Sequence, residues 1–390
     1  MQSRRKFLIQ TGISGIVGGL LGPGRSQALP RTAGDPVSPS AQAMTASAAK
    51  SLRVLILGAT GFIGPHFVRA AVERGHVVSI FSRGRAHADL PSGVERLIGD
   101  RNDNLEALKN REWDVVFDLA AYIPLWVRTL GQVLAGRTKH YTFISTEAVY
   151  RYPGAVDESS AVQEYTGTVD AYSASPEQQY GPLKVLCERE AERQFPGRTL
   201  VLRPGSIVGP NDDRSPAHLY WPVRMQMGGE ILVPGDPAAQ VQMIDVRDLA
   251  EWAVVMAERA QTGTFNGTGP AMPMSWAEML GGIRGSLAVP LKLTWVATQW
   301  LIERKVPGQD QLLFWPTEAG VAGSMQMSND RARARGLTFR PWSTTVADIL
   351  AWYDMQSPRR RRKLISTPGD LTDFMTLERE ILAAWHAQRK

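Results

Sequence analysis

The sequence predicts an α/β protein with a doubly wound parallel sheet and a smaller C-terminal α/β part that binds the substrate. Three observations predict this class: short apolar runs, helical stretches that alternate with them, and a glycine-rich turn directly after the first run. Apolar runs without polar alternation are typical of parallel strands that helices cover on both faces. The alternation of such strands with helices therefore defines the expected architecture.

The predicted strands are continuous apolar segments, at residues 53–57, 76–81, 94–98, 114–121, 141–145 and 200–205. A helical pattern from Pro65 to Arg74 joins the first two strands, and Gly75 ends it. We place the sheet domain at residues 51–205 and the substrate-binding part, interleaved with the last strands of the sheet, at 206–356.

Composition excludes some classes of protein. The chain has 390 residues, of which 43% are hydrophobic and 21% charged, so it can bury a large core without disulfides or metal. Its single cysteine, Cys187, permits neither an intramolecular disulfide nor a structural zinc site, and we expect no metal. Part of the formal charge of +6 lies in two short basic runs, which is too localised to predict a nucleic-acid partner.

The first 28 residues have the pattern of an export signal. Ser3-Arg4-Arg5-Lys6-Phe7-Leu8 precedes a short apolar stretch, and Ser26-Gln27-Ala28 has the small residues that a signal peptidase requires. This pattern resembles a twin-arginine signal, which implies export of the folded protein by the twin-arginine machinery to the periplasm or the medium. The alternatives are an uncleaved anchor and a chance basic start. Residues 29–50, rich in Ala, Ser, Thr and Pro, are predicted to be a flexible linker.

The turn after the first strand reads Gly58-Ala59-Thr60-Gly61-Phe62-Ile63-Gly64. Gly58 permits a tight turn, Gly61 lets a pyrophosphate approach the backbone, and Gly64 lets the helix pack closely on the strand. The free N–H groups and positive dipole end of the helix favour phosphate. This order of strand, glycine turn, helix and strand predicts a dinucleotide site of the Rossmann type. We expect Thr60, Phe62 and Ile63, which also belong to the turn, to contact the cofactor.

The second strand ends Phe81-Ser82-Arg83-Gly84-Arg85. No carboxylate is available there for the hydroxyls of an adenosine ribose, whereas two guanidinium groups can bind a 2′-phosphate, with Ser82 beside them. The sequence therefore favours NADP over NAD. The alternative is that Arg83 and Arg85 are solvated loop charges.

Tyr180-Gly181-Pro182-Leu183-Lys184 puts a phenol and an ammonium group on one face of a helix. A nearby ammonium group and an oxidised nicotinamide ring lower the pKa of a phenol. Tyr180 can then exchange a proton with a substrate hydroxyl or carbonyl while hydride moves to or from nicotinamide. Pro182 predicts that the pair lies in the first turns of its helix. The alternative is a surface pair without a catalytic role.

These motifs resemble the extended short-chain dehydrogenases/reductases, the NAD-dependent epimerase/dehydratase family, in a divergent bacterial branch. The resemblance extends over about residues 51–353 and includes the GxxGxxG spacing, YxxxK and the segments 143–150, 242–249 and 328–337. It implies that Thr146, or as second choice Ser145, hydrogen-bonds the reacting oxygen, and that Lys184 also binds the nicotinamide ribose. Glu147 stands where dehydratases carry a general acid, although an exposed loop glutamate is an equal alternative.

The resemblance also implies further cofactor contacts. The carboxylate of Asp100 would bind the adenine amine, the small side chains of Ala120 and Ala121 would line the path of the cofactor, and Pro204 would border the nicotinamide amide. Homodimers are common in the family, and a homodimer is the expectation it gives.

Two positions depart from the members that act on sugar nucleotides. Ser206 replaces an asparagine, and Val241 replaces an arginine that holds the diphosphate. Without that arginine the charge-assisted contacts to a diphosphate are lost, so a nucleotide sugar is not expected as substrate. We expect the substrate to be bound by Tyr122, Trp221, Arg224 and Gln242. The alternative is that these side chains only pack in the core, where aromatic residues are common.

The predicted function is hydride transfer at a hydroxyl or carbonyl carbon of a sugar-like or other small substrate. A self-recycling epimerase or dehydratase is favoured over a net reductase, because free nicotinamide nucleotides are scarce outside the cytoplasm. The alternative is a cofactor-sensing or RNA-binding Rossmann protein without catalysis, against which Tyr180 and Lys184 argue.

The C-terminal residues 357–390 are expected to hold a solvated basic loop and an amphipathic helix docked on the body. The loop carries Arg359-Arg360-Arg361-Arg362-Lys363, for which a phospholipid or nucleic-acid contact is the alternative.

Overall fold

The computed structural model describes residues 50–85, 88–152, 154–167, 176–213, 216–304, 306, 325–365 and 371–388. The predicted signal at 1–28 and the predicted linker, except for residue 50, lie outside the described residues. Within the described part, no helix has the length and apolar character that crossing a membrane requires.

The centre of the protein is a seven-stranded sheet in the order β11-β6-β5-β4-β1-β2-β3, and every neighbouring pair is parallel. The predicted α/β class is therefore confirmed. The strands are β1 (Arg53–Leu57), β2 (Val77–Ser82), β3 (Glu95–Ile98), β4 (Trp113–Asp118), β5 (Thr138–Ile144), β6 (Thr199–Pro204) and β11 (Gly263–Gly267). The first six were predicted, whereas β11 reads Gly-Thr-Phe-Asn-Gly and lacks an apolar run.

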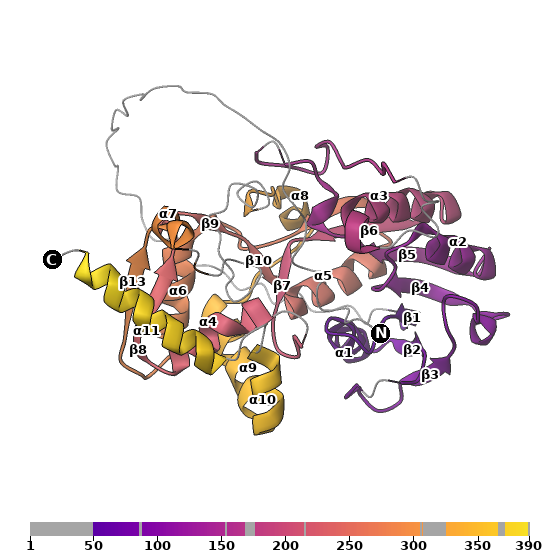
Figure 1. The fold of residues 1–390 in the computed structure, drawn as a ribbon. Helices are drawn as coiled ribbons and strands as arrows, with labels where there is room; N and C mark the ends of the chain where they lie inside the picture. The colour runs from indigo at the N-terminus through magenta and orange to yellow at the C-terminus, as the bar shows by residue number, and fades with distance from the viewer. Residues whose placement is uncertain are drawn as a thin grey trace, which may run out of the picture.

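Helices cover both faces of this sheet, as a doubly wound fold requires. On one face α1 (Gly64–Glu73) packs beside α5 (Val246–Glu258), and on the other α2 (Pro124–Val133) packs beside α3 (Pro176–Gln194). Alternate residues of β1 enter the two cores: Val54 and Ile56 face the first pair of helices, and Leu55 and Leu57 belong to the second core. Figure 1 shows this sheet and its helices on the right.

A second part with its own core lies beside the sheet domain, on the left of Figure 1. It contains the parallel strand pair β8 (Gly229–Pro234) and β13 (Leu291–Val296), with α4 (Pro216–Gln226), α6 (Trp276–Gly285), α7 (Thr298–Glu303), α9 (Trp342–Asp354), α10 (Pro358–Ile365) and α11 (Leu371–Ala387). The remaining strands of the described residues form two short pairs, β7 (Ser206–Val208) with β10 (Met243–Asp245) and β9 (Gln240–Val241) with β12 (Met274–Ser275). Three short helices remain, η2 (Glu106–Leu108), η3 (Glu147–Val149) and α8 (Asp330–Arg333).

Two of the predicted substrate contacts belong to this second core, and that prediction is wrong. Trp221 is 1% exposed and lies edge-on against Trp276, with ring centroids 5.0 Å apart. Arg224 donates to the Glu378 carboxylate (2.8 Å) and to the carbonyl oxygens of Gly228 and Glu230 (both 2.9 Å). These side chains fix α4 to α11 and to the strand β8, so neither is available to a ligand.

The basic run from Arg359 to Lys363 is helical and not a loop, because it forms most of α10. Its arginines and lysine face solvent or lie at the surface, while Leu364 and Ile365 at its end are buried in the second core. The helix is thus anchored by its apolar end.

Candidate cofactor and active site

The glycine turn between β1 and α1 has the close packing that its sequence predicts. Gly58 has φ +85°, and a Cβ added there would lie 2.7 Å from the Cβ of Ala120. A Cβ on Gly64 would lie 2.3 Å from the backbone carbon of Ala59. At Gly61 the nearest atom to such a Cβ is 3.6 Å away. The outer glycines therefore serve internal packing, and Gly61 leaves its outer side open.

The start of α1 lies at this open side. The N-cap residue Ile63 forms no side-chain cap hydrogen bond, and Pro65 near the start of the helix has no N–H group. Uncapped N–H groups at a helix start bind phosphate oxygens through hydrogen bonds and the helix dipole. Phe62 and Ile63 are buried beneath the turn, and Thr60 is half-buried at its rim. The residues present therefore fit the pyrophosphate of a dinucleotide.

The end of β2 presents the predicted arginines to solvent. Arg83 and Arg85 are exposed, and the half-buried Ser82 accepts the N–H of Gly84 at 3.3 Å. Residues 82–85 hold no acidic side chain. The residues at this end of the strand therefore supply no carboxylate that would repel a 2′-phosphate.

The loops after β3 and β4 are joined by a buried ion pair that the sequence did not reveal. Asp118, fully buried at the end of β4, accepts two hydrogen bonds from Arg101 (2.9 and 2.6 Å) and one from the Tyr141 hydroxyl (2.9 Å). It also accepts the N–H groups of Ala120 (3.2 Å) and Ala121 (3.0 Å). Burial alone would raise the pKa of Asp118, but Arg101 and these hydrogen bonds hold it below its ordinary value.

This pair fixes the segment that was predicted to line the cofactor path. Ala120 and Ala121 lie in the loop after β4, which ends at Asp118, and Ala120 lies against Gly58. The Asp100 carboxylate accepts the backbone N–H (3.1 Å) and the side-chain amide (2.8 Å) of Asn102. Its contact to adenine stays a prediction, and so does the contact of the buried Pro204 to nicotinamide.

Lys184 lies at the carboxyl ends of β4 and β5. Its Nζ donates to the carbonyl oxygens of Ala121 (2.9 Å) and Ile144 (2.6 Å) and lies 4.1 Å from the centroid of the Phe143 ring. The residue is 3% exposed, and burial lowers the pKa of its ammonium to about 8. Ligands of doubly wound sheets bind at this edge, so Lys184 stands where the cofactor is expected.

Tyr180 lies one turn before Lys184, in the first turn of the regular part of α3. Gln179 has non-helical angles (φ −141°, ψ 40°) and breaks the helix there, which accommodates Pro182 as the sequence predicted. A Cβ on Gly181 would lie 2.1 Å from the carbonyl oxygen of Ala148, so this turn packs tightly on η3. The half-buried Tyr180 is thereby brought to the segment that carries Thr146 and Glu147.

The three candidate side chains after β5 have different environments. Ser145 is buried, and its hydroxyl donates to the Glu188 carboxylate at 2.5 Å. Thr146 is half-buried, and its hydroxyl oxygen accepts the N–H of Ala148 at 3.2 Å. Since the hydrogen of Ser145 is directed into the core, the geometry favours Thr146 as the donor to a reacting oxygen.

Glu147 is not an exposed loop glutamate. It is half-buried, and burial raises the pKa of its carboxyl to about 8. Its Oε2 lies 3.5 Å from the position of a Cβ on Gly205, directly after β6. The Thr268 hydroxyl lies 2.7 Å from the same position and has no hydrogen-bond partner in the described part of the chain. Glu147 is therefore a carboxyl group with a raised pKa beside the ends of β5 and β6.

A buried polar network behind these residues also escaped the sequence. Arg203 of β6 donates to both oxygens of Glu188 on α3 (3.0 and 2.6 Å) and to the Tyr150 hydroxyl (3.0 Å). The Tyr150 hydroxyl donates to Asn266 at 2.6 Å. Its signal in the sequence was an arginine inside the apolar strand 200–205, which only a buried partner can accommodate.

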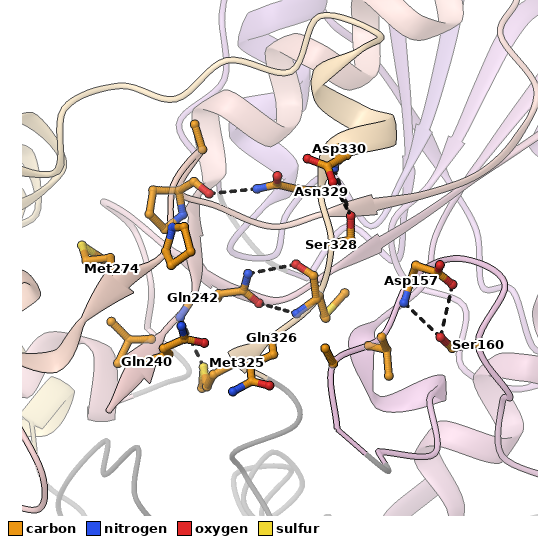
Figure 2. Close-up of a pocket in the computed structure, with 17 residues that line it drawn as sticks. Asp157, Ser160, Gln240, Gln242, Met274, Met325, Gln326, Ser328, Asn329 and Asp330 are labelled. Carbon is orange, nitrogen blue, oxygen red and sulfur yellow. Dashed lines mark hydrogen bonds between the residues drawn. The ribbon is translucent and has the colours of Figure 1, made fainter. Parts of the chain in front are cut away.

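A cavity of about 500 Å³ lies between the loop 155–160, β9 and the segment 325–330. Figure 2 shows that the side-chain amide of Gln242 spans this cavity's wall, donating to the carbonyl of Met327 (2.9 Å) and accepting its N–H (2.8 Å). Gln242 thus lines this cavity, and its contact to a substrate stays a prediction. Tyr122, in the loop after β4, does not line this cavity. The centroid of its ring lies 4.3 Å from that of Trp126 on α2.

This fold and site define a Rossmann dinucleotide-binding protein with the constellation of a short-chain oxidoreductase. The chain belongs to the NAD dependent epimerase/dehydratase family, whose model matches residues 54–267. The resemblance inferred from the motifs is thereby confirmed at the level of the family.

Curated relatives are distant and differ in function. The chloroplast stem-loop binding protein of 41 kDa b from Arabidopsis thaliana is 27% identical over 246 residues, 58% of this chain and 61% of that protein. The 2′-dehydrokanamycin reductase of Streptomyces kanamyceticus is 25% identical over 266 residues, 65% of this chain and 72% of the enzyme. The match thus includes less than two thirds of the Arabidopsis protein.

Solved structures share the fold. The UDP-N-acetylglucosamine 4-epimerase from Methanobrevibacter ruminantium M1, in complex with UDP-N-acetylmuramic acid, matches with a TM-score of 0.57 and 17% identity, over 79% of this chain and 100% of that one. The Bordetella bronchiseptica enzyme WbmH, in complex with NAD+, matches with a TM-score of 0.56 and 16% identity, over 78% and 99%. At these identities the likeness concerns the fold alone.

Proposed function

We propose that this protein is an NAD(P)-dependent enzyme that moves hydride to or from a hydroxyl or carbonyl carbon of a sugar-like or other small substrate. The observation that carries the proposal is the buried ammonium of Lys184 at the carboxyl ends of β4 and β5, one helical turn from Tyr180. Burying an isolated lysine ammonium destabilises the folded state by several kcal/mol. The presence of Lys184 at the edge of the sheet where ligands bind therefore favours a role in the site.

The geometry supports the following roles for the chain's residues. A bound nicotinamide would supply the hydride donor or acceptor. Lys184 uses two of its three N–H donors on backbone carbonyls, which leaves the third for a ribose hydroxyl. Tyr180 exchanges the proton of the substrate oxygen, and the Thr146 hydroxyl donates a hydrogen bond to the same oxygen.

Glu147 supports chemistry that uses a second acid. Reduction of a carbonyl consumes one proton, whereas elimination of a neighbouring hydroxyl needs a further proton on the departing oxygen. A carboxyl group that burial keeps protonated to about pH 8 can supply it. This observation favours the dehydratase version of the self-recycling chemistry over a net reductase.

The pH dependence of stability tests the state of Glu147. Between the ordinary carboxyl pKa of 4.5 and the raised value of about 8, the folded protein keeps a proton that the unfolded chain releases. Stability therefore falls as pH rises through this window, and Glu147→Gln should remove that fall. Chemical denaturation at about pH 5 and about pH 8 should show the variant gaining on the wild type at the higher pH. Glu106→Gln, at an exposed carboxylate, is the control; an equal trend there would contradict the assignment.

Cofactor identity tests the proposal as a whole. Mass spectrometry of the small molecules released from the purified, denatured protein should detect a nicotinamide dinucleotide, and its consistent absence, with no binding of added NAD(H) or NADP(H), would refute the function. NADP is the proposed preference, although the structural neighbour WbmH holds NAD+.

Arg83→Glu should discriminate between the two cofactors. A reversed charge at the end of β2 would repel a 2′-phosphate and leave a ribose hydroxyl unaffected, so NADP affinity should fall about tenfold or more while NAD affinity changes little. Titration of both cofactors by intrinsic fluorescence measures this. Equal losses for both would reject the 2′-phosphate contact, and Arg96→Glu, on the exposed part of β3, controls for net charge.

RNA binding is the second candidate, because one relative is named as a stem-loop binding protein. If binding RNA were the function, the protein would retain RNA in a salt-sensitive manner and Tyr180→Phe would have no effect on any turnover.

Export by the twin-arginine route and a homodimer remain part of the proposal. They rest on residues 3–28 and on the family, respectively.

A further inference from the structure

The carboxylate of Asp118 holds the loop after β4 in place. Asp118 is the last residue of that strand, is 0% exposed, and accepts the backbone N–H groups of Ala120 (3.2 Å) and Ala121 (3.0 Å). The same loop packs on the glycine turn, since a Cβ added to Gly58 would lie 2.7 Å from the Cβ of Ala120. Asp118 therefore fixes a loop that borders the place expected for the pyrophosphate of the cofactor.

Ala121 connects this carboxylate to the ammonium of Lys184. Its N–H donates to Asp118, and its carbonyl oxygen accepts a hydrogen bond from Nζ of Lys184 at 2.9 Å. Nζ has one other acceptor among the described residues, the carbonyl oxygen of Ile144 at 2.6 Å, and it forms no ion pair with them. The position of the ammonium therefore depends on two backbone carbonyls, and Asp118 fixes the residue that provides one of them.

Arg101 joins Asp118 to the loop after β3. Its guanidinium donates to both oxygens of the carboxylate (2.9 and 2.6 Å), and its Cζ lies 5.0 Å from the ring centroid of Trp126. The indole N–H of Trp126 donates to Asn102 at 2.9 Å, and the amide of Asn102 donates to the carboxylate of Asp100 at 2.8 Å. Asp100 is the residue expected to bind the adenine amine. The ion pair and these hydrogen bonds therefore connect the adenine side of the site with the loop after β4.

We infer that Asp118 is a positioning residue, which holds the ammonium of Lys184 at the nicotinamide end of the cofactor through Ala121 and joins that end to the adenine-side loop through Arg101. The inference rests on the proposed function for the presence of the cofactor, and it adds a residue too buried to touch cofactor or substrate. An ion pair with a purely structural role would stabilise the fold without acting on the protonation of Lys184, and this difference can be measured.

The ammonium of Lys184 depends on the charge of Asp118 as well as on its hydrogen bonds. Burial lowers the pKa of this ammonium to about 8. The charged or titratable groups on the packed elements that also act on it are Cys187, Asp118, Glu188 and Arg101. The Cys187 thiol is neutral near that pH, because burial raises its pKa to about 12. The anion of Asp118 raises the pKa of Lys184 and the cation of Arg101 lowers it, so removing the anion alone shifts this pKa further downward.

The pH dependence of cofactor binding tests the inference on the full chain. Above its pKa Lys184 has two N–H groups, both used by carbonyls, so affinity for a reduced dinucleotide should fall about tenfold as the pH rises past about 8. In Asp118→Asn, which keeps an oxygen for the N–H groups of Ala120 and Ala121, this fall should begin at least about half a pH unit lower. Fluorescence titration with NADPH, or with NADH where it binds more tightly, measures the fall. Every protein compared carries Tyr180→Phe, so that this phenol does not titrate.

A second carboxylate of the same strand is the matched control. Asp114 lies at the other end of β4, has a side chain 13% exposed, and is paired with Lys139 at 2.8 Å. Asp114→Asn should leave the fall at the pH of the parent protein. The adenine half alone, 2′,5′-ADP or 5′-AMP, lacks the nicotinamide ribose and should show no such fall in any of these proteins.

An apolar double variant keeps the test decisive if an unpaired Arg101 prevents Asp118→Asn from folding. Asp118→Leu with Arg101→Met removes both charges, a replacement that buried ion pairs often tolerate, but it leaves the N–H of Ala121 without its acceptor. The dinucleotide should then lose about tenfold more affinity than the adenine half, whereas equal affinities to the parent would show a purely structural pair.

The outcomes separate this inference from the proposed function. A parent protein that binds no dinucleotide refutes both. A parent that binds the dinucleotide while Asp118→Asn leaves the fall in place, or while Asp114→Asn shifts it equally, overturns the positioning role alone.

Discussion

Tyr180→Phe is expected to lower kcat by a factor of about 10²–10⁴, the range typical of a lost general acid–base group. The change removes one oxygen from the first turn of α3 and leaves the phenyl ring. The packing of Gly181 on the Ala148 carbonyl does not involve that oxygen, so the fold and the bound cofactor should be retained. The effect should appear in kcat and kcat/KM together, because the proton is exchanged only as the substrate reacts.

Single-turnover measurement of nicotinamide absorbance, on the substrate identified by screening, separates the hydride step from product release. Tyr353→Phe is the matched control, since this tyrosine lies in the second core on α9 and no role in the site is assigned to it. Lys184→Met should lower the rate similarly and also weaken cofactor binding, because Lys184 is expected to bind the ribose. Full turnover in Tyr180→Phe would remove the proposed mechanism.

The sheet and the cofactor turn were predictable because their signals are local. Six strands appear as apolar runs, and the two outer glycines of the turn meet constraints within the turn or the neighbouring loop, as Gly64 does against Ala59. The seventh strand, β11, was missed because its burial comes from its place beside β6 and from α5 above it. Its sequence, with glycine at each end, carries no such signal.

The substrate side was predicted less well, because side chains that bind ligands and those that pack a core are of the same types. Trp221 and Arg224 form an aromatic–arginine pattern that is common at binding sites. In the fold, however, Trp221 packs against Trp276 and Arg224 is paired with Glu378, so both side chains are buried. Gln242 does line a cavity. Only tertiary structure distinguishes these cases, since each partner is more than fifty residues away.

Loss of one member of the buried pair Arg203–Glu188 is expected to have a large effect on stability. Both side chains are less than 10% exposed, and Arg203 forms two hydrogen bonds to the carboxylate. Arg203→Met would leave Glu188 buried without its cation, and removing one member of a buried pair costs about 3–5 kcal/mol in free energy of unfolding. Urea denaturation measures the loss. Arg111→Met, in an exposed pair with Glu95, should cost less than about 1 kcal/mol.

A double variant separates the cost of an unpaired charge from the cost of the lost contacts. Arg203→Met with Glu188→Leu removes both charges, and apolar replacement of a whole buried pair is often neutral. Recovery should be partial, because Ser145 loses the acceptor of its hydroxyl and Tyr150 loses the donor of a hydrogen bond. If the double variant is as unstable as Arg203→Met, the loss does not come from the charge left on Glu188. Glu188 follows Lys184 by one turn on α3. If the double variant recovers stability but not activity, we would conclude that the Arg203–Glu188 pair positions the helix that carries Tyr180 and Lys184.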